Sequence, residues 1–296
     1  MKIVVAGGTG FIGEPLVRKL LPRGDVVVLS REPSRVRAGR GVAWDGKTDG
    51  AWSREIADAD VLINLAGENI AAGRWTDERK RRLVASRLDA TRALIAAIQK
   101  TPGRARTLIN GSAVGFYGNR GDEALDENAS TGAGFLADLV VQWENAARAA
   151  ETIARVVVLR FGVVLGKGGG ALGKMELPFK LGAGGPIGSG TQWMSWIHRD
   201  DVIGLIEWAI DDENVRGVYN ATAPEPVRNR DFVRAFGKAL HRPAILPAPA
   251  FALRLAFGQM ADETLLGGQR VLPARAIAEG FRFSHSTVGE ALGRIY

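Results

Sequence analysis

Hydrophobic residues in the first half of the chain fall in short continuous runs that alternate with segments of helical periodicity. These runs predict strands at 2–6, 26–30, 60–64, 106–111 and 154–160, and helical spacing predicts helices at 11–22, 76–99 and 134–150. Continuously apolar strands are typical of a parallel sheet that is covered on both faces. The order of elements therefore predicts an α/β fold with a doubly wound parallel sheet.

The residue composition of the chain changes after about residue 165. Glycine-rich stretches at 166–170 and 182–186 precede a tail that is interrupted by prolines. Such sequence predicts a smaller lobe at the carboxyl ends of the strands, where ligands bind in open α/β sheets. We expect a nucleotide-binding domain over 1–165 with a return segment at about 198–215, and a substrate-binding lobe over 166–197 and 216–296.

The segment from Lys2 to Gly13 carries the strongest functional signal, because an apolar strand leads into a glycine-rich turn and then a helix. Its glycines fit both G-x-G-x-x-G and the wider G-x-x-G-x-x-G spacing. The first glycines allow a tight turn, the middle one admits a pyrophosphate, and the last brings helix and strand together. The alternative is an ordinary turn without a ligand. The predicted contacts are Gly7, Gly10, Phe11, Ile12 and Gly13, with the helix start facing the pyrophosphate.

The end of the second strand predicts which dinucleotide binds. A site for NAD needs an acidic residue there to accept hydrogen bonds from the ribose 2′-OH, but this chain has Ser30 and Arg31. A guanidinium suits a 2′-phosphate, and the serine adds a hydroxyl donor. Glu32 lies one position later and is expected to point elsewhere. We therefore expect NADP(H), the alternative being that Arg31 is a solvated surface residue.

A polar segment follows the strand at 60–64. Asn64, Ala66 and Gly67 come at its carboxyl end, where the nucleotide crevice of such a sheet lies. We expect their backbone groups near the ribose and nicotinamide. The alternative is a plain exit from strand to loop.

Composition narrows the function classes. The 296 residues include no cysteine, which excludes disulfides and thiolate metal sites, and the formal net charge is +7. Basic residues are dispersed apart from 79–82, which we interpret as a solvated helix face, so we expect no nucleic-acid partner. No apolar run is long enough for a membrane span, and Met1 leads straight into a strand. We expect a cytoplasmic protein without a membrane partner.

Several motifs along the whole chain resemble the extended short-chain dehydrogenase/reductases. They include Gly-Gly-Thr-Gly-Phe-Ile-Gly, Asn64-Leu-Ala-Gly67, Tyr117-Gly118, Leu159-Arg-Phe-Gly162, Trp196-Ile-His-Arg-Asp-Asp201 and Tyr219-Asn220. Arg74-Trp75, Trp143-Glu144 and the tail through Gln269-Arg-Val-Leu-Pro273 are similar to the atypical branch called "epimerase family protein". This resemblance implies a nicotinamide cofactor and a small-molecule substrate such as a nucleotide-sugar. A homodimer is also compatible with it.

One departure from that family concerns the proton relay. Ordinary members use a tyrosine with a lysine four residues later, which lowers the pKa of the phenol. None of the three tyrosines here has a lysine at that spacing, and the family alignment places Leu136 and Val140 at the two positions. The standard relay is therefore missing from the sequence.

Three other residues are candidates for the reaction. Ser112 comes at the end of a predicted strand, where the resemblance implies a substrate contact; the alternative is a turn-capping hydroxyl. Tyr117 either approaches the nicotinamide or packs with its hydroxyl bonded. Glu144 is either a desolvated base or a structural residue. All three are predicted catalytic residues.

Two further patterns receive structural interpretations. His198 lies beside Asp200 and Asp201, and we expect a hydrogen-bonded histidine before a capped helix rather than a metal site. The stretch 168–175 fits G-x-x-x-x-G-K but ends in methionine, where a phosphate loop needs Ser or Thr. We expect a flexible loop on the substrate side there.

Three functions are compatible with these patterns. The first is an NADP(H)-dependent oxidoreductase or epimerase that acts on a nucleotide-sugar or another small carbonyl or hydroxyl compound. The second is a redox sensor that binds NADP(H) but has lost catalysis. The third is an interaction protein in which the nucleotide only stabilises the fold. The glycine turn favours the first two, and the missing relay shifts weight toward the second.

Overall fold

The computed structural model describes residues 1–101 and 106–296. Seven parallel strands form the main sheet in the order β11-β7-β5-β4-β1-β2-β3. Their bounds are β1 (Lys2–Ala6), β2 (Asp25–Ser30), β3 (Arg40–Ala43), β4 (Val61–Asn64), β5 (Thr107–Ala113), β7 (Arg155–Phe161) and β11 (Gly217–Ala221). The predicted doubly wound parallel sheet is confirmed.

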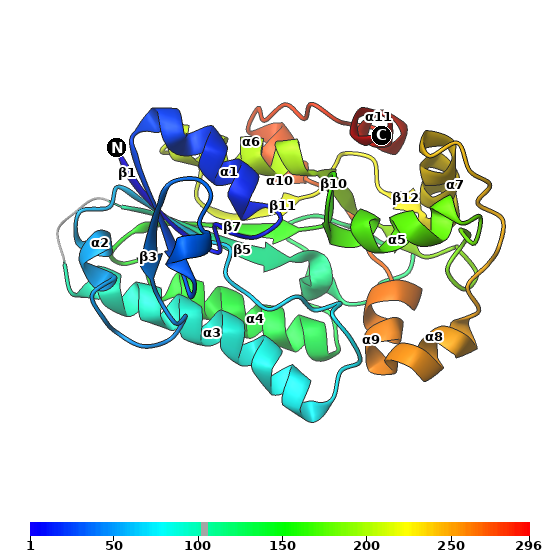
Figure 1. Ribbon diagram of the computed structural model, residues 1–296, viewed down its shortest axis with the longest axis horizontal. Coiled ribbons are helices and arrows are strands. Elements are labelled where there is room, and N and C mark those ends of the chain that lie inside the picture. The colour runs from blue at the N-terminus through cyan, green and yellow to red at the C-terminus, as the bar shows by residue number, and fades with distance from the viewer. Residues whose placement is uncertain (102–105) are drawn as a thin grey trace.

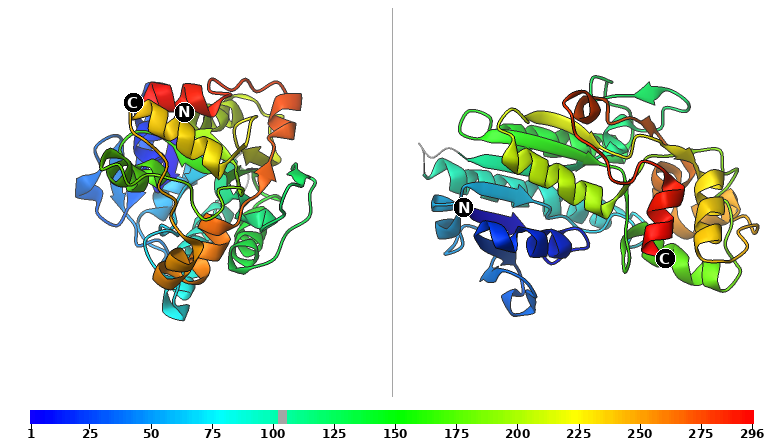
Figure 2. Two further views of the ribbon diagram at one scale, coloured as in Figure 1. Left: turned by 90° about the vertical axis from the view of Figure 1, so that its right-hand side faces the viewer. Right: turned by 90° about the horizontal axis from the view of Figure 1, so that it is seen from above.

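Helices cover both faces of this sheet (Figures 1 and 2). On one face lie α1 (Gly13–Leu20), α6 (Arg199–Asp211) and α10 (Ala274–Ala278); on the other lie α2 (Ser53–Ala57), α3 (Asp77–Gln99) and α4 (Phe135–Arg148). All three predicted helices are present, with ends one or two residues from those expected. No described helix has the length and apolarity that crossing a membrane would require.

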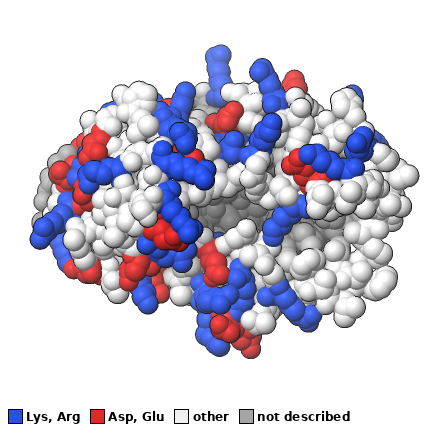
Figure 3. All heavy atoms as spheres, in the orientation of Figure 1, with Lys and Arg blue, Asp and Glu red and all other residues white. Residues whose placement is uncertain are grey.

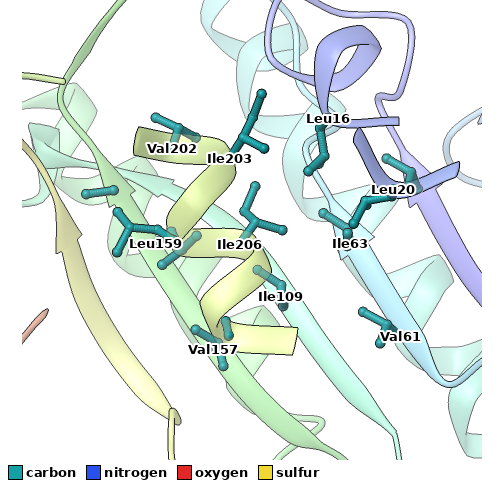
Figure 4. Close-up of a cluster of buried hydrophobic side chains, with 14 of the residues drawn as sticks. Leu16, Leu20, Val61, Ile63, Ile109, Val157, Leu159, Val202, Ile203 and Ile206 are labelled. Carbon is teal, nitrogen blue, oxygen red and sulfur yellow. The ribbon is translucent and has the colours of Figure 1, made fainter. Parts of the chain in front are cut away.

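Buried aliphatic side chains join the sheet to its helices. On the α1 and α6 face, Leu16 and Leu20 meet Ile63, while Ile206 packs toward Ile109 (Figure 4). A second cluster lies between the sheet and the helices α2, α3 and α4. Both faces of the inner strands β1, β4, β5 and β7 are thus largely removed from water, which explains their continuous apolar runs in the sequence.

The second lobe is built from short elements. They are β8 (Val163–Leu165), α5 (Gly170–Lys180), β9 (Trp193–Met194), β10 (Trp196–His198), β12 (Val227–Arg228), α7 (Asn229–Ala239), α8 (Ala250–Phe257), α9 (Gln259–Ala261), a π-helical turn (Asp262–Leu266) and α11 (Val288–Ile295). A small pair joins β6 (Ala124–Leu125) to β13 (Arg270–Val271). The core of the second lobe is rich in aromatic side chains and includes Phe179, Trp196, Phe232 and Phe236.

Two features of the main sheet differ from the sequence predictions. The four-residue strand β3 was not predicted. The division of the chain also placed 216–296 in the second lobe, whereas β11 pairs with β7 at the edge of the main sheet. The segment that returns to the first domain therefore extends through Ala221 rather than ending at about residue 215.

Candidate functional site

The turn between β1 and α1 has the shape of a dinucleotide cradle. Gly7 has φ +81°, and a Cβ there would lie 2.7 Å from the Leu65 carbonyl carbon. A Cβ on Gly13 would lie 2.2 Å from the Gly7 oxygen, so only glycine allows this approach of helix and strand. A Cβ on Gly10 would meet a single neighbour, at 3.3 Å, which leaves its outer side open to a ligand. These residues fit a pyrophosphate at the start of α1.

The helix start that faces this cradle is free of side-chain caps. Ile12 precedes α1 and makes no side-chain capping bond. The Glu14 N–H donates to the Gly10 oxygen at 3.0 Å and Pro15 has no N–H, so the N–H groups that could meet an anion at this turn are those of Phe11, Ile12 and Gly13. The Phe11 ring lies beneath the Arg199 guanidinium, 4.9 Å from its centroid, and contacts the glycines of 166–170. These glycines thus pack on the nucleotide turn. The flexible loop expected over 168–175 is wrong for most of that stretch, because α5 begins at Gly170 and includes Gly173 and Lys174.

The end of β2 carries the two residues that were expected to contact a 2′-phosphate, Ser30 and Arg31. The Ser30 hydroxyl accepts the Glu32 N–H at 3.1 Å, and the Glu32 carboxylate pairs with Arg35 at 2.7 Å. Arg31 is exposed, and no hydrogen bond or ion pair of its side chain occurs among the described residues. The Arg31 guanidinium is therefore available to a phosphate, because the carboxylate of the adjacent residue Glu32 is already paired with Arg35.

Asn64 holds the end of β4 beside its neighbour β5. Its amide donates to Asn110 Oδ1 at 2.7 Å and to Thr91 Oγ1 at 3.0 Å, and its oxygen accepts the Ala66 N–H. Because all of these contacts are buried or half-buried, the side chain fixes the strand end. The backbone contact of Ala66 and Gly67 to the cofactor stays a prediction.

The three predicted catalytic side chains belong to one buried network whose centre is Arg160. The Ser112 hydroxyl donates to Glu144 Oε1 at 2.6 Å, and Arg160 donates to both oxygens of Glu144 at 2.7 and 2.8 Å. Arg160 also donates to the Tyr117 hydroxyl at 2.8 Å, which in turn lies 2.7 Å from Asn220 Oδ1. The structure brings together residues from β5, α4, β7 and β11.

This network is shielded from solvent. Ser112 and Glu144 are each 2% exposed and Tyr117 is fully buried. Burial raises the pKa of Tyr117, although the charge of Arg160 acts in the opposite direction. Burial alone would lower the pKa of Arg160, but the hydrogen bonds and charge of Glu144 raise it instead. The Tyr117 phenol and the Arg160 guanidinium therefore both keep their protons at neutral pH.

The positions of the missing relay lie beside a carboxylate from the C-terminal region. Leu136 packs near Gly115 and Val140 is buried. Glu263 accepts the N–H groups of Phe135 and Leu136 at 3.2 and 2.9 Å and thereby caps α4. A cavity of about 100 Å³ adjoins this cap and is lined by Gly115, Leu136, Asn119, Glu263 and Gln269, among others. The sequence analysis did not predict a role for Glu263, because its partners are 127 and 128 residues away.

His198 takes the structural role expected of it. Its Nδ1 accepts the Asp200 N–H at 3.1 Å and caps α6. The fold also brings in His285, whose ring stacks on that of His198 with centroids 3.9 Å apart and a tilt of 26°. Together with Asp200 these histidines could offer three ligand atoms within 4.8 Å. However, an imidazole nitrogen binds a metal in the plane of its ring. The planes of these two stacked rings are nearly parallel and do not meet close to both rings, so we assign no metal site.

Comparison with known proteins places this geometry in a family. Residues 3–222 match the NAD dependent epimerase/dehydratase family, and residues 248–295 match a domain of unknown function, DUF1731. The epimerase family protein Mb2239 of Mycobacterium bovis is 42% identical over 294 residues, covering 98% of this chain and 96% of its own. Epimerase family protein YfhF of Bacillus subtilis is 40% identical and covers 100% of this chain and 98% of its own.

A solved structure is similar over the same length. The crystal structure of human epimerase family protein SDR39U1 with NADPH has a TM-score of 0.91 and 38% identity, and the match covers 100% of this chain and 99% of the human one. The glycine cradle, the order of the elements and these matches all indicate the same family. The chain belongs to the NAD dependent epimerase/dehydratase family.

Proposed function

We propose that this protein is an NADP(H)-dependent oxidoreductase or epimerase that acts on a small carbonyl or hydroxyl compound, with nucleotide-sugars as one candidate class. The observation that carries the proposal is the glycine cradle beside the unpartnered guanidinium of Arg31. The human relative that was crystallised with NADPH supports the choice of cofactor. When bound, the nicotinamide supplies or accepts a hydride.

The residues of the cradle would divide the binding of the cofactor. The amides of Phe11 and Ile12 at the start of α1 would hold the pyrophosphate, with Gly10 allowing close approach. Ser30 and Arg31 would contact the 2′-phosphate. The backbone of Ala66 and Gly67 would line the crevice beside the ribose and nicotinamide.

Ser112, Tyr117 and Glu144 are the proposed residues of the reaction side. Since they are buried and bonded to one another or to Arg160, we assign them the task of holding the carboxyl ends of β5 and β7 against α4. Strand ends held rigidly in this way would position a substrate for hydride transfer. It does not by itself replace the missing proton relay.

A second candidate is an NADP(H)-binding redox sensor without turnover. The pairing of these side chains favours it, because the hydroxyl protons of Ser112 and Tyr117 are already donated, to Glu144 and Asn220, and are not offered to a substrate. The two functions share the cofactor site and differ only in turnover.

Titration of NADPH and NADH tests the cofactor assignment. We expect Arg31→Ala to weaken NADPH binding by about tenfold or more, the loss of a charge-assisted contact, and to leave NADH binding nearly unchanged. Arg37→Ala is a matched control from the same exposed segment. Equal losses for both nucleotides would refute the NADP(H) assignment. A screen of NADPH oxidation with carbonyl compounds and nucleotide-sugars then separates the enzyme from the sensor, which binds NADPH without oxidising it.

A further inference from the structure

A large exposed apolar surface lies on the second lobe, away from the cofactor cradle. Six side chains there are between 54% and 78% exposed. They are Leu177 and Leu181 at the end of α5, Ile245 and Leu246 in the following connection, and Phe251 and Leu255 on α8. We call them the α5–α8 face. The lower right of Figure 3, over α8, is mostly free of charged side chains.

Backbone contacts make these three segments one surface. The Leu246 N–H donates to the Gly184 oxygen at 3.0 Å, and Ala248 forms a bridge with Ile187. The apolar residues of each helix are four positions apart and therefore share one side of it. The connection 242–249 thus joins the end of α5 to the start of α8 in a continuous apolar strip.

The strip is held firmly rather than being a loose end. No residue of α8 is buried, yet the Arg74 guanidinium donates to the Leu255 oxygen at 2.9 Å, and Phe257 packs in the cluster of Trp75 and Leu83. A helix whose outward side carries Phe251 and Leu255 is thereby fixed to the first domain. Large exposed apolar surfaces on soluble proteins mark interaction sites.

Charge around the strip indicates what it contacts. Residues 170–190 and 238–258 contain five Lys or Arg and one acidic residue, Glu176. Lys180 pairs with Glu176 and Arg254 pairs with Asp262, whereas Lys174, Lys238 and Arg242 have no carboxylate partner among the described residues. Two identical copies facing each other here would bring their cations together, which opposes a symmetric dimer through this face. An anionic lipid surface satisfies both features, since exposed Phe and Leu enter the acyl boundary while Lys and Arg lie at the headgroups.

We propose that the α5–α8 face docks the protein reversibly on an anionic lipid surface. Neither helix crosses the membrane: the apolar side chains enter the interface, and Lys180, Lys238 and Arg242 lie among the anionic headgroups. The proposal does not depend on the cofactor or on turnover. It departs from the expectation, drawn from the lack of a membrane-spanning run, that the protein has no membrane partner, because it assigns a surface contact rather than a span.

Co-sedimentation with lipid vesicles tests this proposal on the full chain. We expect binding to mixed phosphatidylcholine and phosphatidylglycerol vesicles, and weak binding to phosphatidylcholine alone or at high salt. The double variant Phe251→Ser, Leu255→Ser should bind about tenfold less, because two buried apolar side chains are lost from the interface. Lys238→Gln with Arg242→Gln should reduce the binding that depends on salt.

Ile277→Ser is the matched control, since Ile277 is 50% exposed on α10 and lies outside the face. It should bind vesicles like the wild type, and circular dichroism checks that every variant is folded. Failure of the wild type to bind anionic vesicles would overturn the proposal, as would equal binding by the Phe251 and Leu255 variant. A dimer that this variant dissociates in analytical ultracentrifugation would assign the face to a second copy instead.

Discussion

At the scale of single residues, the buried pair of Arg160 and Glu144 is the strongest constraint on the site. Both side chains are 3% exposed, and two hydrogen bonds join them. We expect Arg160→Met to cost about 3–5 kcal/mol in the free energy of unfolding, because the Glu144 carboxylate stays buried without its cation. Urea unfolding measures this. The double variant with Glu144→Leu should regain most of the loss, and a small loss for Arg160→Met alone would show that water reaches the carboxylate.

The same residues show how far sequence reasoning reaches at this scale. Ser112, Tyr117 and Glu144 were each selected from motifs, and the structure does place them in one network. Arg160, which bonds both Glu144 and Tyr117, was given no role, although a charged residue at the end of the apolar strand at 154–160 is itself a signal. Arg160 is 16 residues from Glu144 and 43 from Tyr117 along the chain. Local periodicity carries no information on contacts at such separations.

At the scale of elements, the start of α6 is sensitive to pH. His198 accepts the Asp200 N–H through Nδ1, so the neutral ring carries its proton on Nε2, and protonation of Nδ1 would break the cap. Burial lowers the pKa of His198 and the stacked His285 lowers it further, with Arg199 acting the same way and Asp200 and Asp201 opposing.

A His whose pKa is lower in the folded state stabilises the fold fully above its unfolded pKa of about 6.5 and loses that contribution as the pH falls. We therefore expect the melting temperature to drop between pH 7.5 and 5.5. His198→Asn keeps a capping oxygen and removes the titration, so its drop should be smaller. His241→Asn, which changes an exposed histidine, is the control. An equal drop in all three proteins would assign the pH dependence to other groups.

The two strands of the main sheet that were not predicted, β3 and β11, differ from those that were. Each predicted strand is a buried apolar run. By contrast, β3 has only four residues, begins with Arg40 and is not buried, so no such run marks it. The strand β11 contains Tyr219 and Asn220 and follows the change in composition after residue 165, and only its pairing with β7 assigns it to the main sheet. The strand β3 gives a weak signal because water contacts it, whereas β11 is buried at Tyr219, Asn220 and Ala221 but its polar residues interrupt the apolar run.

At the scale of the whole molecule, the C-terminal region closes the fold onto the first domain. Asp201 on α6 accepts the N–H groups of Ser284 and His285, and Glu263 caps α4. Met260 and Leu265 pack with residues of α3 and α4. Because these contacts join segments that are far apart in the chain, the helix at 134–150 could be predicted but the residue that caps it could not.

The cap by Glu263 predicts a coupling between the two lobes. Glu263→Ala removes the acceptor of two N–H groups and a negative charge from the positive end of α4, so we expect a loss of about 0.5–2 kcal/mol in the free energy of unfolding. Hydrogen exchange followed by mass spectrometry should become faster both at 259–267 and at the start of α4. Glu290→Ala, an exposed change in α11, should leave both segments unchanged. Faster exchange at 259–267 alone would mean that α4 is held by its other contacts, and that the carboxylate fastens the C-terminal region without stabilising the helix beside the missing relay.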